Sequence, residues 1–126
     1  MAKQIINSKN APAPIGPYSQ AVLVDNTLYI SGQIAIIPES GALAVENIVN
    51  ETRQVMNNIH AILTEAGMDF PNVVKTTILL TDIDQFAKVN EVYAAFFTTD
   101  FPARETYAVK ALPKGVHLEI SMIAVK

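Results

Sequence analysis

The fold class is decided by the stretch Val116-His117-Leu118-Glu119-Ile120-Ser121-Met122-Ile123-Ala124-Val125, which alternates as a β-strand does. One face of this strand carries Leu118, Ile120, Met122 and Ala124, and the other carries His117, Glu119, Ser121, Ile123 and Val125. Neither face is fully polar. We therefore expect helices to cover one face of the sheet and a second subunit to meet the other.

Earlier segments predict the remaining strands. Residues 104–110 form a strand, and Leu112-Pro113-Lys114-Gly115 then makes a turn into 116–125 because Pro and Gly suit turns. Residues 73–80 are short and rich in β-branched side chains, which indicates a strand inside the sheet. Residues 21–24 and 28–31 flank Asp25-Asn26, a pair that tolerates left-handed conformations, so a hairpin is expected.

Apolar side chains three and four residues apart predict a helix over 48–66, with Asn47 as its cap and Gly67 as its stop. A second helix is predicted over 84–98, where Phe86, Val89, Tyr93, Phe96 and Phe97 share one face and Phe101-Pro102 ends it. The order of elements predicts an α+β fold of one domain over residues 1–126, with two helices on one face of a mixed sheet. Residues 11–18 contain three prolines, which predict an ordered, non-helical loop that presents Tyr18 rigidly.

Composition limits the classes of function. The 126-residue chain has a net charge of −3 and no basic stripe, which argues against nucleic-acid binding. It contains no cysteine, so disulfides, thiolate nucleophiles and cysteine-bound metals are excluded. Hydrophobic residues make up 50% of the chain, which favours a homo-oligomer that buries some of its surface. The sequence shows neither a signal peptide nor a bilayer-spanning run, so the cytoplasm is the default location.

Metals and nucleotide cofactors are not expected. The two histidines, His60 and His117, have no metal-binding spacing to a second ligand. The five glycines are scattered without the spacing of a phosphate loop. His60 is interpreted as a structural or surface histidine. His117 shares a strand face with Glu119, which keeps a supporting role beside that residue open.

Arg104 and Glu119 stand out as charged residues in the last two predicted strands. The residues alone leave two interpretations open. One is a structural ion pair across neighbouring strands, which is ordinary; the other is a mid-strand glutamate with a raised pKa that performs acid–base chemistry. Asn90 lies at the margin of the aromatic helix face, so its amide either reaches a pocket or bonds to nearby backbone.

Six motifs follow one another along the chain: Ile15-Gly16-Pro17-Tyr18-Ser19-Gln20, Ser31-Gly32-Gln33, Val74-Lys75-Thr76-Thr77, Val89-Asn90, Phe101-Pro102-Ala103-Arg104 and Leu112-Pro113-Lys114. Together they resemble the RidA family, also called YjgF/YER057c/UK114, from about residue 3 onward. The resemblance implies a chorismate-mutase-like α+β fold and a homotrimer with clefts between subunits. It also implies cofactor-free hydrolysis of enamine/imine intermediates, such as 2-iminobutanoate and 2-iminopropanoate, to 2-keto acids and ammonia.

At the matching positions, the resemblance implies that Arg104 binds the substrate carboxylate and that Glu119 directs a water. It also implies that the substrate pocket includes Tyr18, Ser31, Gly32 and Asn90. A guanidinium suits the first role, because its paired donors match the two oxygens of a carboxylate.

One departure from the family pattern is Thr106, where many members carry cysteine. Period-two alternation puts Thr106 on the strand face of Arg104, so we expect its hydroxyl to line the pocket and to alter substrate preference. Two other classes of function stay open. Some relatives have been described as ribonucleases or translation inhibitors, and the same pocket can serve a regulator that binds keto acids without turnover.

Overall fold

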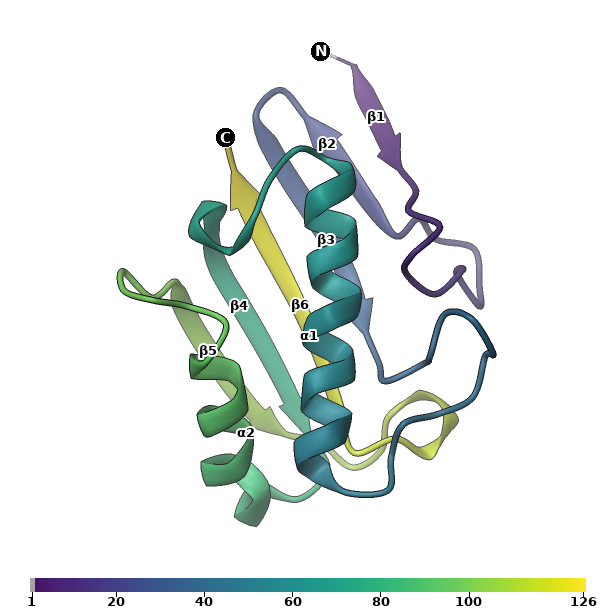
Figure 1. Ribbon diagram of the computed structural model, residues 1–126, viewed down its shortest axis with the longest axis vertical. Coiled ribbons are helices and arrows are strands. Elements are labelled where there is room, and N and C mark those ends of the chain that lie inside the picture. The colour runs from purple at the N-terminus through teal and green to yellow at the C-terminus, as the bar shows by residue number, and fades with distance from the viewer. Residues whose placement is uncertain (1) are drawn as a thin grey trace.

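The computed structural model describes residues 2–126, within which six strands form one mixed sheet and two α-helices cover one of its faces (Figure 1). The strands are β1 (Lys3–Ile6), β2 (Ala21–Val24), β3 (Thr27–Gln33), β4 (Val73–Leu80), β5 (Ala103–Ala108) and β6 (Leu118–Val125). The helices are α1 (Ile48–Glu65) and α2 (Phe86–Ala94), with short 3-10 turns at Phe70–Asn72, Ile83–Gln85 and Pro113–Gly115. The predicted α+β class is confirmed.

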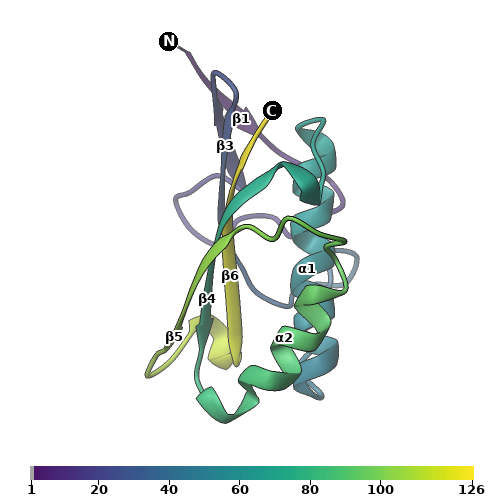
Figure 2. The same ribbon diagram turned by 90° about the vertical axis from the view of Figure 1, so that its left-hand side faces the viewer.

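The sheet has the strand order β1-β2-β3-β6-β4-β5. Neighbouring strands are antiparallel except β4 and β5, which are parallel and are joined through α2. Figure 2 shows both helices on the same side of the sheet. The alternation predicted for β6 is confirmed, because the helix-facing side chains are at most 2% exposed: Leu118, Ile120, Met122 and Ala124.

The helix α1 forms where its sequence pattern predicts it. The Asn47 side chain accepts a hydrogen bond from the Asn50 N–H at 2.8 Å and caps the first turn. Gly67 follows the last turn with φ +73°, a left-handed conformation that glycine adopts without strain. Val55, Ile59 and Leu63 are fully buried against the sheet, so this helix closes the core.

The second helix is shorter than predicted and ends at Ala94 instead of residue 98. The N–H groups of Ala95, Phe96 and Phe97 bond to carbonyls three residues back, which tightens the chain into turns. Phe96 and Phe97 then pack on Phe70, with ring centroids 5.4 Å apart in both pairs. Packing against an aromatic neighbour therefore overrides the helical pattern in this segment.

The strand boundaries need three further corrections. The N-terminal strand β1, which pairs with β2, was not predicted. The strand expected over 104–110 spans Ala103–Ala108, and the strand expected from residue 116 begins at Leu118. Within the part of the chain that the structure describes, neither helix is long and apolar enough to cross a membrane.

Within residues 2–126, no helix covers the face of the sheet opposite α1 and α2, and this face carries apolar side chains. Tyr29 is 50% exposed and Val125 is 38% exposed on this face, next to the half-buried Leu79 and Ile123. We refer to it below as the open face.

Candidate functional site

Glu119 lies in a cavity of about 340 Å³ on the open face of the sheet. Its lining combines the predicted pocket residues Tyr18, Ser31, Gly32 and Glu119 with Ile15, Ile34 and Pro113. A register shift in the β3–β6 pairing falls between Ile30 and Gln33, at the position of Ser31 and Gly32. The structure therefore brings four of the predicted site residues together.

Gly32 leaves the space that the Glu119 carboxylate occupies. A Cβ added at Gly32 would lie 2.7 Å from Glu119 Cδ and would overlap its Oε2. Burial raises the pKa of Glu119 above its ordinary value of 4.5. A carboxylate with a raised pKa is a better proton acceptor, which suits a group that takes a proton from water.

The proline-rich loop before β2 holds Tyr18 at the rim of this cavity. The Tyr18 hydroxyl accepts a hydrogen bond from the Ile15 N–H at 3.2 Å, and Ser31 Oγ donates to the Ser19 carbonyl at 2.6 Å. The buried side chain of Gln20 accepts from the Ser8 N–H at 2.7 Å and donates to the Pro12 carbonyl at 3.0 Å. The loop is non-helical, as predicted, and these hydrogen bonds connect it to the residues around it.

Arg104 lies in a second cavity, of about 400 Å³, beside α2. Its lining residues are Asn90, Tyr93, Ala94, Phe101, Pro102 and Arg104. The guanidinium Cζ is 5.1 Å from the ring centroid of Tyr93 and 5.4 Å from that of Phe86. Cation–π contacts with these two rings hold the guanidinium, and no ion pair of Arg104 occurs among residues 2–126, so its hydrogen-bond donors suit an anion.

Two buried polar atoms have no hydrogen-bond partner within residues 2–126. They are Asn90 Oδ1 in α2 and Thr106 Oγ1 on the helix-facing side of β5. Asn90 Oδ1 therefore does not bond to nearby backbone, and Asn90 lines the cavity that contains Arg104. Thr106 lies on the strand face of Arg104, but it is not among the lining residues of that cavity. Unpaired buried acceptors are uncommon and mark positions where a ligand donor would fit.

Arg104 and Glu119 lie on opposite faces of the sheet. Arg104 is in register with Thr76, a core residue whose hydroxyl accepts a hydrogen bond from Tyr93 of α2 at 3.0 Å. Glu119 alternates with the core residues Leu118 and Ile120 and therefore points to the open face. The structural ion pair considered from the sequence does not form among the described residues. The chain thus carries two groups of candidate site residues, one on each face of the sheet, and we refer to each group below as a half-site.

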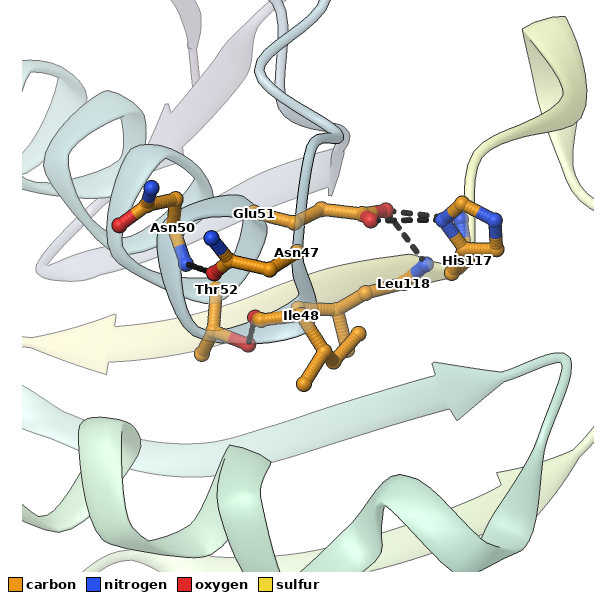
Figure 3. A network of polar contacts seen from close by, with 7 residues as sticks. All are labelled: Asn47, Ile48, Asn50, Glu51, Thr52, His117 and Leu118. Atoms are coloured by element: carbon orange, nitrogen blue, oxygen red, sulfur yellow. Dashed lines mark hydrogen bonds and ion pairs between the residues drawn. The ribbon is translucent and has the colours of Figure 1, made fainter.

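The His117 side chain contacts α1 rather than lying beside Glu119, contrary to the supporting role left open above. It precedes β6, and its Nδ1 lies 2.8 Å from Oε1 of Glu51 in α1 (Figure 3). Glu51 was missed in the sequence because a glutamate in the first turn of a helix is ordinary at an exposed position. His60 stacks on Phe70 and lies 3.6 Å from Asp69, as expected of a structural histidine.

Among residues 2–126, no cluster of three or more His, Asp or Glu side chains is arranged to hold a metal ion. Residues 8–126 match the protein family described as endoribonuclease L-PSP. The chain belongs to the endoribonuclease L-PSP family. A Capra hircus member named 2-iminobutanoate/2-iminopropanoate deaminase is 54% identical over 126 residues, which cover 100% of this chain and 92% of the relative.

Solved structures of family members match along almost the whole chain. A Rid-family protein of unknown function, YyfA from Yersinia pestis, is 50% identical with a TM-score of 0.97, over 99% of this chain and 100% of its own. The YjgF gene product of E. coli is 42% identical with a TM-score of 0.94, over 98% of each chain. The predicted membership in the RidA/YjgF family is therefore confirmed.

Proposed function

We propose that this protein is a 2-iminobutanoate/2-iminopropanoate deaminase that hydrolyses reactive enamine/imine intermediates of amino-acid metabolism to 2-keto acids and ammonia. The observation that carries the proposal is the 54% identity over the full chain to the Capra hircus protein of that name. The two half-sites support it, because they supply a guanidinium beside aromatic rings for a carboxylate and a carboxylate with a raised pKa for a water.

In the proposed reaction, Arg104 holds the carboxylate of the 2-imino acid through paired hydrogen bonds. Glu119 accepts a proton from a water as the water oxygen bonds to the imine carbon. The electrons of the C=N double bond move to nitrogen, and Glu119 passes its proton to that nitrogen. The hydroxyl proton of the tetrahedral adduct then moves through Glu119 to the nitrogen as the C–N bond breaks, so that ammonia leaves and the C=O bond of the keto acid forms. Proton transfers balance through Glu119, so the reaction requires no redox partner.

We further propose a homotrimer with its sites between subunits, located in the cytoplasm. Arg104 and Glu119 are on opposite faces of one sheet. A substrate that contacts both residue types therefore has to lie between Arg104 of one subunit and Glu119 of the partner subunit. The apolar open face supports such an assembly, since a second subunit would remove its exposed side chains from water. In this arrangement Tyr18, Ser31 and Gly32 accompany Glu119, whereas Asn90 and Thr106 accompany Arg104.

The direct test generates an unstable imine in solution with an amino-acid oxidase and follows its loss with and without the protein. A deaminase accelerates the loss and forms keto acid and ammonia in equal amounts. Imine loss at the uncatalysed rate, together with keto-acid binding, would instead identify a regulator that binds metabolites without turnover.

Endoribonuclease activity is the second candidate, because the family description names it. A net charge of −3 opposes it, since RNA binding depends on cationic contacts to phosphates. Cleavage of RNA that weakens with salt and disappears in Arg104→Ala would support this candidate over the deaminase.

A further inference from the structure

Glu51 is a fully buried carboxylate that the proposed reaction does not use. It projects from the first turn of α1 toward the start of β6 (Figure 3). Its Oε2 accepts hydrogen bonds from the backbone N–H groups of His117 at 2.7 Å and of Leu118 at 3.0 Å. Its Oε1 lies 2.8 Å from His117 Nδ1. All three polar contacts of this buried carboxylate therefore involve two consecutive residues.

The location of these contacts follows from the sheet. On one side of β6, the pairing with β3 reaches Gln33 and Ile120, and β3 ends there. On the other side, the Thr81 N–H donates to the His117 carbonyl at 3.1 Å beyond the end of β4. Glu51 thus accepts backbone hydrogen bonds where the neighbouring strand β3 no longer reaches, and a charged acceptor makes them stronger than a neutral one.

Burying an unpaired carboxylate is costly, so a sequence that retains one needs donors that match it. Here the hydrogen bonds from the His117 and Leu118 N–H groups to Glu51 fix the backbone immediately before Glu119. The Glu119 side chain leaves this backbone on the opposite face and is packed against Gly32 with no room for a methyl group. A small displacement of the start of β6 would therefore move the Glu119 carboxylate out of its narrow space.

We propose that Glu51 is a positioning residue for Glu119, holding the start of β6 so that the water-directing carboxylate lies correctly against Gly32. The inference rests on the proposed deaminase function. Arg104 lies on β5, two strands away from β6 in the sheet order, so Glu51 affects the step at the imine carbon and not the capture of the substrate carboxylate.

The test compares Glu51→Gln with the wild-type protein. Glutamine keeps the shape and an acceptor oxygen but loses the charge that both N–H groups share. We expect kcat for imine hydrolysis to fall by about 10- to 100-fold, the range that misplacement of a reacting group produces. The affinity for the 2-keto acid product, measured by calorimetry, should stay within about twofold, since it reports the carboxylate contact with Arg104.

A pH profile provides the readout that a general loss of stability would not move. If Glu119 relaxes toward water in Glu51→Gln, its pKa falls toward the ordinary value, and the acidic limb of the kcat profile moves to lower pH. Glu65→Gln is the matched control, because it makes the same change at an exposed position of the same helix. It should behave as the wild-type protein does.

A folded Glu51→Gln variant with wild-type kcat would overturn the inference. Parallel losses of kcat and keto-acid affinity would also overturn it, because they indicate general disruption. If Glu51→Gln does not fold, His117→Ala decides. This change removes one of the three contacts of Glu51, and the His117 side chain is 53% exposed, so the protein should tolerate its loss. A fall in kcat of about threefold at unchanged keto-acid affinity supports the inference, and wild-type kcat refutes it. A wild-type protein without turnover would refute the proposed function itself.

Discussion

Arg104 is held by two aromatic rings, and this environment makes the geometry of its guanidinium as important as its charge. Arg104→Lys keeps a cation but replaces a planar pair of donors with a point charge. We expect kcat/KM for imine hydrolysis to fall by about 100-fold or more, and Arg104→Ala to abolish acceleration. Arg53→Lys is a suitable control, because the exposed Arg53 donates to Asn50 Oδ1 at 3.0 Å on the surface of α1. A kcat/KM for Arg104→Lys close to that of the wild-type protein would remove Arg104 from the site.

Gly32 is required by space rather than by backbone conformation. The methyl group of Gly32→Ala would overlap the Glu119 carboxylate, so we expect kcat to fall by about tenfold or more while the protein remains folded. Gly41→Ala is the opposite case. A Cβ there meets nothing within 4 Å among the described residues, but φ is +77°, so the change should lower the free energy of unfolding by about 1 kcal/mol and leave kcat unchanged. Equal effects of the two changes on kcat would contradict this interpretation.

The raised pKa of Glu119 predicts the pH dependence of both activity and stability. As a base, Glu119 acts when ionised, so kcat should fall as the pH drops through its raised pKa. For stability, a folded-state pKa above the unfolded value of 4.5 makes a contribution that is present below pH 4.5 and is lost as the pH rises through the folded pKa. Glu119→Gln should therefore be inactive, yet melt at a slightly higher temperature than the wild-type protein near neutral pH. The difference should disappear toward pH 4.5, which thermal melts across this range can check.

Asn58 shows how α1 fixes a neighbouring loop. Its buried amide donates to the carbonyls of Ile34 at 3.2 Å and Ile36 at 2.9 Å, just after β3. Asn58→Asp removes both donors and places acceptors opposite acceptors, which should lower the free energy of unfolding by about 2–4 kcal/mol in urea titrations. Asn57→Asp makes the same change at the adjacent exposed position and should alter stability by less than about 0.5 kcal/mol. Similar losses in both variants would contradict the role assigned to Asn58.

Elements with a strong local pattern were predictable from the sequence, whereas elements set by distant packing were not. The cap at Asn47 and the stop at Gly67 are local features, and α1 begins and ends where they predict. The four residues of β1 carry no such pattern and form a strand because β2 provides its edge. The start of β6 depends on Glu51, which is 66 residues away from His117 in the sequence.

The same distinction applies to the candidate site. The family resemblance predicted one pocket for the candidate site residues, and Tyr18, Ser31, Gly32 and Glu119 do line one cavity, whereas Asn90 lines another. The motifs could not show that Arg104 faces the other way. Alternation fixes faces within each strand, but the relation between β5 and β6 depends on their registers with β4, which lies between them. The position of Arg104 and Glu119 on opposite faces is therefore visible only at the scale of the folded molecule.

Because the half-sites lie on opposite faces, mixing two inactive variants should restore activity. Arg104→Ala and Glu119→Gln, each with its own affinity tag, are co-expressed, and trimers that carry both tags are purified. In the homotrimer proposed above, a closed ring of three, every mixed trimer has one interface that joins an intact Arg104 to an intact Glu119. The mixed trimers should therefore show about one third of the wild-type kcat per protomer, whereas each parent variant shows none. Mixed trimers as inactive as their parents would contradict a site shared between subunits, and failure to recover both tags on one particle would refute the oligomer itself.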